Sequence, residues 1–121
     1  MDRKADAQWK GDLKGGHGTL SVGSKAFSGS YSFISRFEGN GETNPEELLG
    51  AAHAGCYSMA LAHALAQAGH PPTSVTTTAT VHINKGEAGF AITGITLTTR
   101  GVVPGLSAEQ FLTFAEQTKT G

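Results

Sequence analysis

The sequence predicts an α+β fold, in which antiparallel strand blocks surround one long buried central helix. Three observations predict it. A block of short strand candidates comes first, an uninterrupted helix candidate fills residues 45–68, and two longer strand candidates with a short helix follow. This order of elements is typical of α+β proteins. With 121 residues the chain has the length of one small domain, so we expect residues 1–121 to form a single domain.

The first strand block is expected over residues 8–13, 17–22 and 31–37. In the third segment, aromatic residues at a spacing of two or four share one face: Tyr31, Phe33 and Phe37. Glycines at 15, 16 and 18 separate the first two segments. No Lys-Ser/Thr pair follows these glycines, so they indicate a hairpin turn rather than a phosphate-binding loop.

The central helix is expected to begin after Asn44 and to run over residues 45–68. Asn44 suits the N-cap, Pro45 the first helical position and Glu47 the third residue of a capping box. Gly69 is the expected stop signal. Most of the side chains in its middle are Ala or Gly, which favours close burial among strands or against a second helix.

Two longer strands are expected over residues 75–83 and 89–97. The first alternates cleanly, and its inward side chains are Val75, Ala79, Val81 and Ile83. The second changes phase near Gly94, which indicates a β-bulge there.

A short second helix is expected after Ser107. Ser107 and Gln110 have the spacing of a capping box, and the apolar side chains that follow share one face: Phe111, Phe114 and Ala115.

Composition excludes several classes of protein. The formal net charge is −1 and no basic stripe is present, which argues against a nucleic-acid-binding protein. No apolar run is long enough for a signal peptide or a membrane span. The single cysteine fits a reducing cytoplasm. Hydrophobic residues make up 38%, a modest core that a partner subunit would help to complete.

The lone cysteine, Cys56, is the candidate reactive group. An ordinary thiol has a pKa of about 8.5, so about 3% is thiolate at neutral pH. Cys56 lies about three turns into its helix, where the helix dipole has faded. A side-chain cation must therefore activate it, and Arg36 is the best candidate, because it ends a segment expected to be an aromatic-rich strand. Glu46 is expected to hold the guanidinium of Arg36 in a bidentate pair.

Helix geometry separates two of these residues. Glu46 and Cys56 are ten residues apart, about 15 Å along a straight helix and about 80° around it. Glu46 therefore cannot touch Cys56 of its own helix. We interpret the spacing as a site shared between subunits, in which Arg36 and Glu46 serve the Cys56 of a second chain in a homodimer.

Other interpretations stay open at this stage. Cys56 also suits inert core packing, Arg36 an ordinary surface position and Glu46 a simple complement to the helix dipole. A rival metal site would use side chains near one stripe of the helix: His53, Cys56 and His63. Two ligands from one helix and a distant third make a poor tetrahedron without help from another chain, so solvated or packed histidines are the better interpretation.

The motif around these residues resembles the OsmC/Ohr family. The matching run comprises Arg-Phe-Glu-Gly at residues 36–39 and the segment from Thr43 through Asn-Pro-Glu-Glu-Leu to Cys56. The likeness extends to residues 9–13, 87–92 and 103–106, and it is greatest for the osmotically inducible OsmC branch.

This resemblance implies a thiol-dependent peroxidase that reduces organic hydroperoxides to alcohols in oxidative or osmotic stress. It implies an intertwined homodimer with active sites at the subunit interface, and neither cofactor nor metal. Cys56 would be the peroxidatic cysteine, Arg36 would stabilise its thiolate and the leaving alkoxide, and Glu46 would orient Arg36. The implied reductant is an external thiol, a lipoyl dithiol rather than thioredoxin.

One departure from the family pattern concerns turnover. The family carries a second, resolving cysteine in a segment after Lys-x-Gly, and this sequence ends at Lys119-Thr120-Gly121. We therefore expect residues 1–121 to lack that segment and the family's last strand. The alternative function is a non-catalytic dimer that binds a hydrophobic ligand beside Cys56. In either case the expected pocket side chains are Phe33, Phe37, Tyr57 and Met59.

Overall fold

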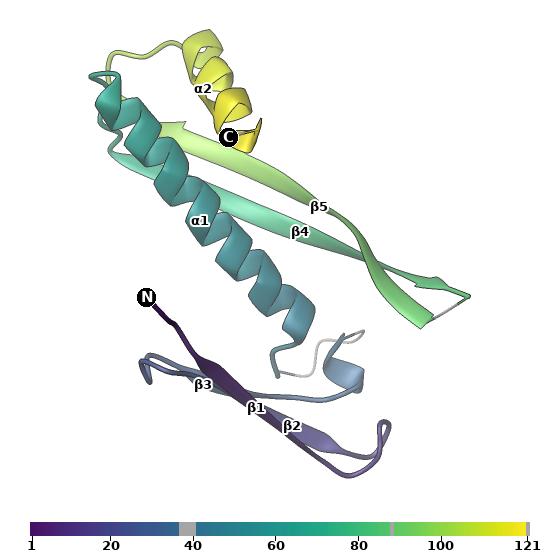
Figure 1. Ribbon diagram of the computed structural model, residues 1–121. Helices are drawn as coiled ribbons and strands as arrows, with labels where there is room; N and C mark the ends of the chain where they lie inside the picture. Colours follow the sequence, from purple (N-terminus) through teal and green to yellow (C-terminus); the bar gives the residue numbers. More distant parts are fainter. Residues whose placement is uncertain (37–40, 88, 121) are drawn as a thin grey trace. The chain divides into compact units, whose positions relative to one another are not determined.

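The computed structural model describes residues 1–36, 41–87 and 89–120 (Figure 1). Two compact units make up the chain, Met1–Leu48 and Leu49–Gly121, and each is described by itself. The elements are β1 (Ala5–Lys10), β2 (His17–Val22), β3 (Ser28–Tyr31), a 3₁₀ turn η1 (Ile34–Arg36), α1 (Pro45–Gln67), β4 (Ser74–Gly86), β5 (Gly89–Val102) and α2 (Ala108–Thr120). The predicted α+β class is confirmed, whereas a single domain over residues 1–121 stays a prediction.

The first unit contains an antiparallel three-stranded sheet in the order β1-β2-β3. Gly18 in β2 pairs with Trp9 in β1 and with Tyr31 in β3. The two aromatic rings close over this glycine, with their centroids 5.4 Å apart. A Cβ at Gly18 would lie 2.7 Å from the Trp9 ring and overlap the Tyr31 ring, so this close packing requires a glycine.

The predicted first strand is wrong in its bounds, because β1 covers Ala5–Lys10 rather than residues 8–13. The strand ends where Gly11 takes a positive φ of 95°, a conformation that glycine adopts without strain. Residues 5–8 show no apolar alternation because almost all of β1 is exposed. The second strand has the predicted bounds, residues 17–22.

The predicted third strand is also wrong: β3 ends at Tyr31, and η1 replaces the strand at residues 34–36. The cause lies in two serines. The backbone N–H of Ser32 donates to Ser35 Oγ at 2.9 Å, and the N–H of Ser35 donates to Ser32 Oγ at 3.2 Å. These side-chain hydrogen bonds stabilise a turn, and the turn replaces the backbone hydrogen bonds that a β-strand would make with its neighbour. Phe37, predicted to share the aromatic face, lies outside the described residues.

The predicted central helix is confirmed as α1. The Glu47 N–H donates to Asn44 Oδ1 at 2.7 Å, which makes Asn44 the N-cap. The Glu47 carboxylate accepts from Thr43 Oγ1, so the capping box forms only its first half. Gly69 ends the helix with a φ of 89°, and the N–H groups of Gly69 and His70 donate to the carbonyls of Ala66 and Leu65. This pattern is the Schellman motif.

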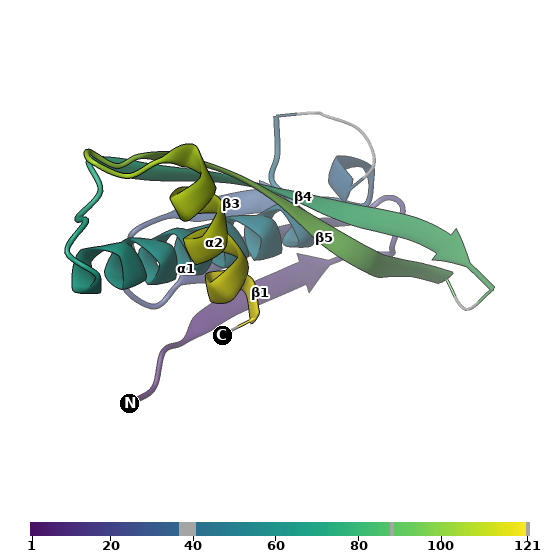
Figure 2. The same ribbon diagram turned by 90° about the horizontal axis from the view of Figure 1, so that it is seen from above.

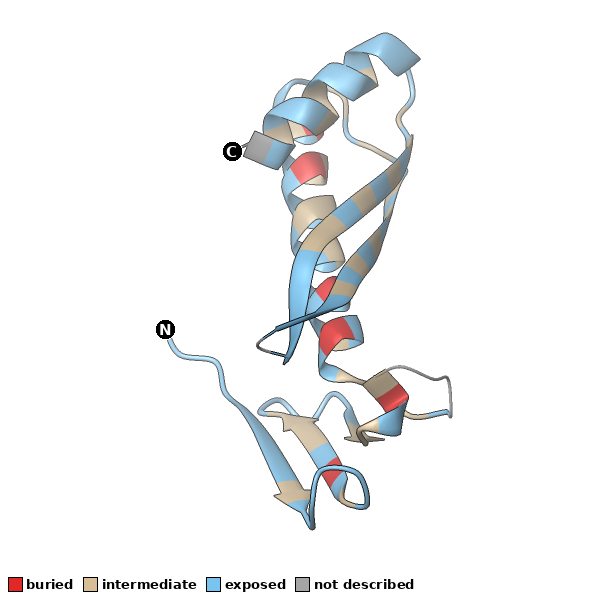
Figure 3. Cartoon of the chain, turned by 90° about the vertical axis from the view of Figure 1, so that its right-hand side faces the viewer, coloured by how far each residue is buried: buried red, intermediate tan, exposed pale blue. Residues whose placement is uncertain are grey.

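One stripe of α1 is buried within the second unit (Figure 3). Leu61 and Leu65 are completely buried, and Gly50 lies so close to β4 that a Cβ there would be 3.1 Å from Val81. Ser58 Oγ donates to Thr77 Oγ1 of β4 at 2.6 Å. The rest of the helix in this unit is largely exposed. In the single chain, α1 is therefore buried on one face only, rather than on all sides as expected.

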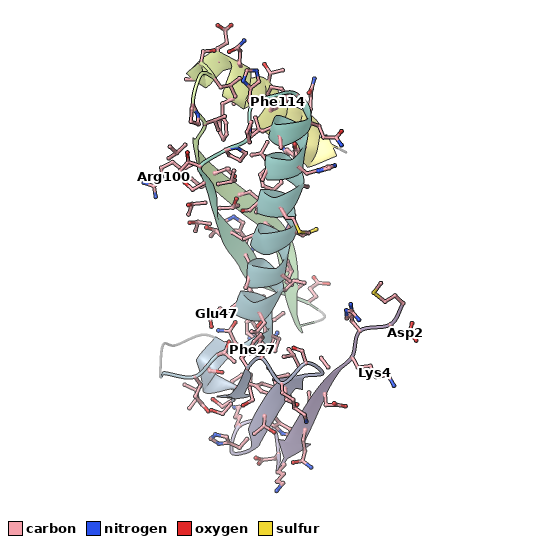
Figure 4. All side chains as sticks on the ribbon, turned by 90° about the vertical axis from the view of Figure 1, so that its left-hand side faces the viewer. Asp2, Lys4, Phe27, Glu47, Arg100 and Phe114 are labelled. Carbon is pink, nitrogen blue, oxygen red and sulfur yellow. The ribbon has the colours of Figure 1, made fainter. Side chains whose placement is uncertain are left out.

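The strands β4 and β5 form a long antiparallel hairpin. Its side chains alternate between half-buried and exposed over residues 74–83 and 95–102, whereas residues 84–86 and 89–93 are exposed (Figure 3). The inward positions of β4 predicted from the sequence are confirmed. The predicted bulge near Gly94 is confirmed as well, because His82 pairs with Gly94 while Ile83 pairs with Ile92, which leaves Thr93 as the extra residue. Arg100 lies on the exposed face and points away from α1 (Figure 4).

The second helix, α2, follows the hairpin and lies near the C-terminal half of α1 (Figure 2). Its predicted capping box is complete: Ser107 Oγ accepts the N–H of Gln110, and Gln110 Oε1 accepts the N–H of Ser107. Tyr57 of α1 donates its hydroxyl proton to the carbonyl of Ala115 at 2.8 Å. The apolar face of α2 therefore packs within the second unit, as predicted.

Among the described residues, no helix is both long enough and apolar enough to cross a lipid bilayer.

Candidate functional site

Arg36 is the last residue of η1, and the reciprocal serine bonds described above fix the backbone just before it. Its side chain is about one-third exposed, at 32%. The guanidinium is therefore accessible from one side and held by protein on the other. The side chain also contacts Glu46, so it is held on the protein surface rather than fully solvated.

Glu46 lies in the first turn of α1 and is buried, with 6% of its surface exposed. Its Oε1 accepts a hydrogen bond from Arg36 Nε at 2.8 Å and a second from Arg36 Nη2. The predicted contact between Arg36 and Glu46 is confirmed. Its geometry differs from the predicted bidentate pair, because both guanidinium donors meet a single carboxylate oxygen.

The second carboxylate oxygen of Glu46, Oε2, is buried and has no hydrogen-bond partner among the described residues. A buried carboxylate is costly unless it is paired, and removal of one partner of a buried ion pair is strongly destabilising. The position of Glu46 at the positive end of the α1 dipole adds a favourable interaction. Glu46 thus complements the helix dipole and also holds Arg36, which unites two interpretations that the sequence left open.

Cys56 lies in the second unit, on the side of α1 away from the buried stripe, and its side chain is exposed. Core packing within this chain therefore does not explain it. The structure brings Arg36 and Glu46 together within Met1–Leu48, and it places Cys56 in Leu49–Gly121. An exposed thiol is open to reagents from solution, which reactive cysteine chemistry requires.

A hollow of about 150 Å³ opens beside the Arg36 side chain in the first unit. Among the described residues, most of its lining is apolar or aromatic and the guanidinium is the one charged group: Trp9, Leu13, Tyr31, Ser32, Phe33, Arg36 and Pro45. Its size suits a small organic group rather than an extended ligand. Phe33 lines this hollow beside Arg36, and the pocket expected beside Cys56 stays a prediction.

The other residues of the expected hydrophobic pocket lie elsewhere. Tyr57 lines a groove of about 700 Å³ between α1, β5 and α2 in the second unit. Met59 is 70% exposed, and Phe37 lies outside the described residues. Burial raises the pKa of the Tyr57 hydroxyl above its ordinary value, and the negative charge of Glu116 adds to the rise while a hydrogen bond with Thr99 opposes it.

The rival metal site does not form in this chain. Over residues 1–36, 41–87 and 89–120, no three His, Cys, Asp or Glu side chains gather as metal ligands. His53 and His63 are exposed, like Cys56 between them. The side chains of His53, Cys56 and His63 therefore do not come close enough together to bind one metal ion.

Two polar side chains near η1, those of Asn44 and Glu42, make contacts that the sequence pattern did not predict. Asn44 donates from Nδ2 to the carbonyl of Ser35 at 3.0 Å, a contact that its role as an N-cap does not require. Glu42 accepts from Ser32 Oγ at 2.9 Å and pairs with His17 at 2.9 Å. The spacing of Ser32 and Ser35 was the one available signal, since serines three apart favour a side-chain-bonded turn.

Comparisons with known proteins agree with this fold. Residues 38–120 match the family described as OsmC-like protein. The chain is 49% identical over 122 residues to "Peroxiredoxin OsmC" of Escherichia coli strain K12, and the match covers 100% of this chain and 85% of that protein.

Solved structures show the same fold at lower identity. One is the organic hydroperoxide resistance protein OsmC from Legionella pneumophila, with a TM-score of 0.72, 21% identity and coverage of 97% of this chain and 82% of that one. Another is the organic hydroperoxide resistance protein OhrB of Bacillus subtilis, with a TM-score of 0.71, 22% identity and coverage of 97% and 84%. The order of elements, the family match and the full-length relative together place the chain: it belongs to the OsmC family.

Proposed function

We propose that this protein is a thiol-dependent peroxidase that reduces organic hydroperoxides to alcohols, with Cys56 as the attacking group, in cytoplasmic stress defence. The ion pair between Arg36 and the buried carboxylate of Glu46 is the observation that carries the proposal. A buried carboxylate that fixes an arginine beside an apolar hollow is an arrangement suited to a substrate that becomes an anion. The relative named "Peroxiredoxin OsmC" supports a peroxidase-type function.

In the proposed reaction the Cys56 thiolate attacks the outer oxygen of the hydroperoxide. A sulfur–oxygen bond forms, the oxygen–oxygen bond breaks, and the alkoxide leaves with its electron pair and takes up a proton to become the alcohol. The sulfur is oxidised to a sulfenic acid and the peroxide is reduced. Negative charge thus moves from sulfur to the leaving oxygen.

Arg36 is proposed to stabilise both negative charges, first on the thiolate and then on the alkoxide. A guanidinium is planar and permanently charged, and its Nε and Nη2 both donate to Glu46, which holds the plane of the group in one orientation. Glu46 positions the guanidinium. Preorganised charge of this kind stabilises a transition state without reorganisation during the reaction. The apolar hollow beside Arg36 supports a preference for organic hydroperoxides over hydrogen peroxide.

Regeneration is proposed to use an external dithiol of the lipoyl type. Cys56 is the one cysteine in residues 1–121, so no second thiol among these residues resolves the sulfenic acid. One thiol of the reductant attacks the sulfenic sulfur and releases water, which leaves a mixed disulfide. The second thiol then displaces Cys56 as a thiol and closes the reductant into a cyclic disulfide.

The proposed working form is a homodimer with shared sites, in which Arg36 and Glu46 of one chain act on Cys56 of the other. Two features support it. Glu46 and Cys56 are ten positions apart on one helix, and the face of α1 that carries Cys56 is exposed in the single chain. Burial of such a face by a second copy removes apolar surface from water, which favours association.

The proposal is tested by rapid-mixing kinetics with cumene hydroperoxide and with hydrogen peroxide, for the parent protein and for Cys56→Ser. We expect the parent to consume cumene hydroperoxide much faster than hydrogen peroxide, and Cys56→Ser to consume neither. Consumption by Cys56→Ser at the parent rate would contradict the proposed role of Cys56.

The alternative function, a dimer that binds a hydrophobic ligand without turnover, rests on the same apolar hollow. The kinetic test separates the two. Saturable binding of cumyl alcohol by the parent, with no consumption of the hydroperoxide by the thiol, would favour the binding function.

A further inference from the structure

The Arg36–Glu46 pair joins two elements that are separate along the chain. Arg36 ends η1, whereas Glu46 lies in the first turn of α1. A single ion pair between long side chains fixes their separation poorly, because each side chain loses rotamer freedom to hold one geometry. The two backbones therefore need a connection of their own if the guanidinium is to stay in one place.

The side-chain amide of Asn44 makes that connection. Its Oδ1 accepts the N–H of Glu47 at 2.7 Å, and its Nδ2 donates to the carbonyl of Ser35 at 3.0 Å. One bond reaches the residue after Glu46 and the other reaches the residue before Arg36. Both partners are backbone groups of fixed polarity, so the orientation of the amide is determined: only a carbonyl oxygen can accept from an N–H, and only an NH₂ can donate to a carbonyl.

The capping role of Asn44 does not explain the second bond. Aspartate and serine cap helices about as well as asparagine, because a cap needs only an acceptor oxygen. Aspartate has no donor, and the serine hydroxyl is one atom closer to the backbone, so neither replaces the Nδ2 donor of the amide. Its acceptor lies on a fixed backbone, since Ser35 is 5% exposed and Ser35 Oγ donates to the carbonyl of Ser32 at 2.8 Å.

We propose that Asn44 is a positioning residue whose amide ties the turn that carries Arg36 to the helix start that carries Glu46, and so holds the guanidinium in its reactive place. This inference deepens the proposed function, on which its catalytic part rests. Asn44 touches neither reacting atom. It acts through Arg36, by limiting how far η1 moves from the first turn of α1.

The matched variants are Asn44→Asp and Asn44→Ser. Both keep an oxygen that caps α1, and both lose the donor to the Ser35 carbonyl. Asn44→Asp adds a negative charge, whereas Asn44→Ser is neutral, so an effect shared by both comes from the lost donor. Asn84→Asp is the charge control, because the Asn84 amide bonds Thr93 in the exposed part of the hairpin, within the second unit.

The first measurement is the rate at which phenylglyoxal labels Arg36, followed by peptide mass spectrometry. The other two arginines, Arg3 and Arg100, serve as internal references. We expect labelling of Arg36 to rise about fivefold in both Asn44 variants, the factor that corresponds to one ordinary hydrogen bond, and to stay unchanged in Asn84→Asp. A change in the cap alone would not alter the ratio of Arg36 labelling to reference labelling.

The second measurement is the rate constant for consumption of cumene hydroperoxide. We expect it to fall about tenfold in both variants, because the guanidinium is no longer held in one position. Thermal unfolding establishes that each variant is folded at the assay temperature. Parent-like labelling of Arg36 in both variants would overturn the inference, and so would a change in Asn44→Asp alone. The two measurements can also disagree. If the parent does not consume hydroperoxide but Arg36 is labelled faster in both Asn44 variants, the positioning role is upheld and the proposed function is refuted.

Discussion

At the scale of single residues, the ion pair between Arg36 and Glu46 is the feature that most constrains the chemistry. Glu46 is buried, and the nearby positive charge of Arg36 offsets the cost of removing its carboxylate from water. Nε and Nη2 of Arg36 both donate to one carboxylate oxygen of Glu46, a contact that depends on the planar shape of the guanidinium. The identity of the cation, and not only its charge, therefore matters.

Arg36→Lys tests that point. A lysine keeps the positive charge but loses the planar fork that meets Glu46 through two nitrogens. We expect the rate constant with cumene hydroperoxide to fall about tenfold to a hundredfold, in keeping with the loss of one hydrogen bond between charged groups. Arg100→Lys, on the exposed face of β5, is the control and should react like the parent. A parent-like rate in Arg36→Lys would show that a point charge suffices.

Tyr57 offers a prediction for alkaline pH. Because burial raises the pKa of its hydroxyl in the folded state, folding favours the neutral phenol. The stabilising contribution is complete below the unfolded-state pKa of about 10, and it is lost as the pH rises through the folded-state value. Titration of phenolate absorbance should therefore show a high-pKa component that Tyr57→Phe removes. The stability of Tyr57→Phe should also depend less on alkaline pH, and an equal dependence would contradict the assignment.

At the scale of elements, the first sheet depends on a glycine. The rings of Trp9 and Tyr31 close over Gly18, which pairs with both residues. We expect Gly18→Ala to lower the free energy of unfolding by about 1–3 kcal/mol, because the added methyl overlaps both rings. Chemical denaturation measures the change.

The control for this substitution is another strand glycine. A Cβ at Gly94 would meet only His82 Cδ2, at 3.9 Å, which is an ordinary contact. Gly94→Ala should therefore have little effect on the free energy of unfolding. Equal losses in the two variants would mean that alanine is disfavoured in these strands for reasons other than the aromatic rings.

The elements differ in how far the sequence predicted them. The helix α1, its caps at Asn44 and Gly69, and the capping box at Ser107 depend on local hydrogen bonds, and local sequence specifies these. The first and third strands were misplaced for opposite reasons. The exposed β1 carries no apolar pattern, and the aromatic pattern after Tyr31 continues through a turn that two serine side chains impose.

The candidate site was predicted only in part. The contact of Arg36 with Glu46 follows from charge and motif, and the structure confirms it. The bond from Asn44 to the Ser35 carbonyl joins residues nine apart and depends on how η1 folds. No local pattern specifies such a contact, so the sequence assigned Asn44 a cap and nothing more.

At the scale of the whole molecule, the central prediction is a site shared between two chains. Mixing Cys56→Ser with Arg36→Lys tests it. In a shared site, a mixed dimer combines Arg36 of the first variant with Cys56 of the second and rebuilds one intact site. After exchange of subunits, we expect activity to rise well above that of either variant, to about a quarter of the parent value for random pairing.

The mixing experiment would give a different result if each site were formed within one chain. If Arg36 and Cys56 of the same chain form the site, every site in the mixture carries one substitution, and the activity stays at the average of the two variants. Sedimentation equilibrium gives the accompanying control. A parent protein that is active and strictly monomeric at the assay concentration would exclude a shared site.

The most direct test of the proposed peroxidase is the intact mass of the protein before and after one equivalent of cumene hydroperoxide, with a sulfenic-acid trap present. We predict a gain of one oxygen atom, or the trapped adduct, located on Cys56 by peptide mapping. An unchanged mass with Cys56 still titratable as a free thiol would contradict the proposal and favour a protein that binds without reacting.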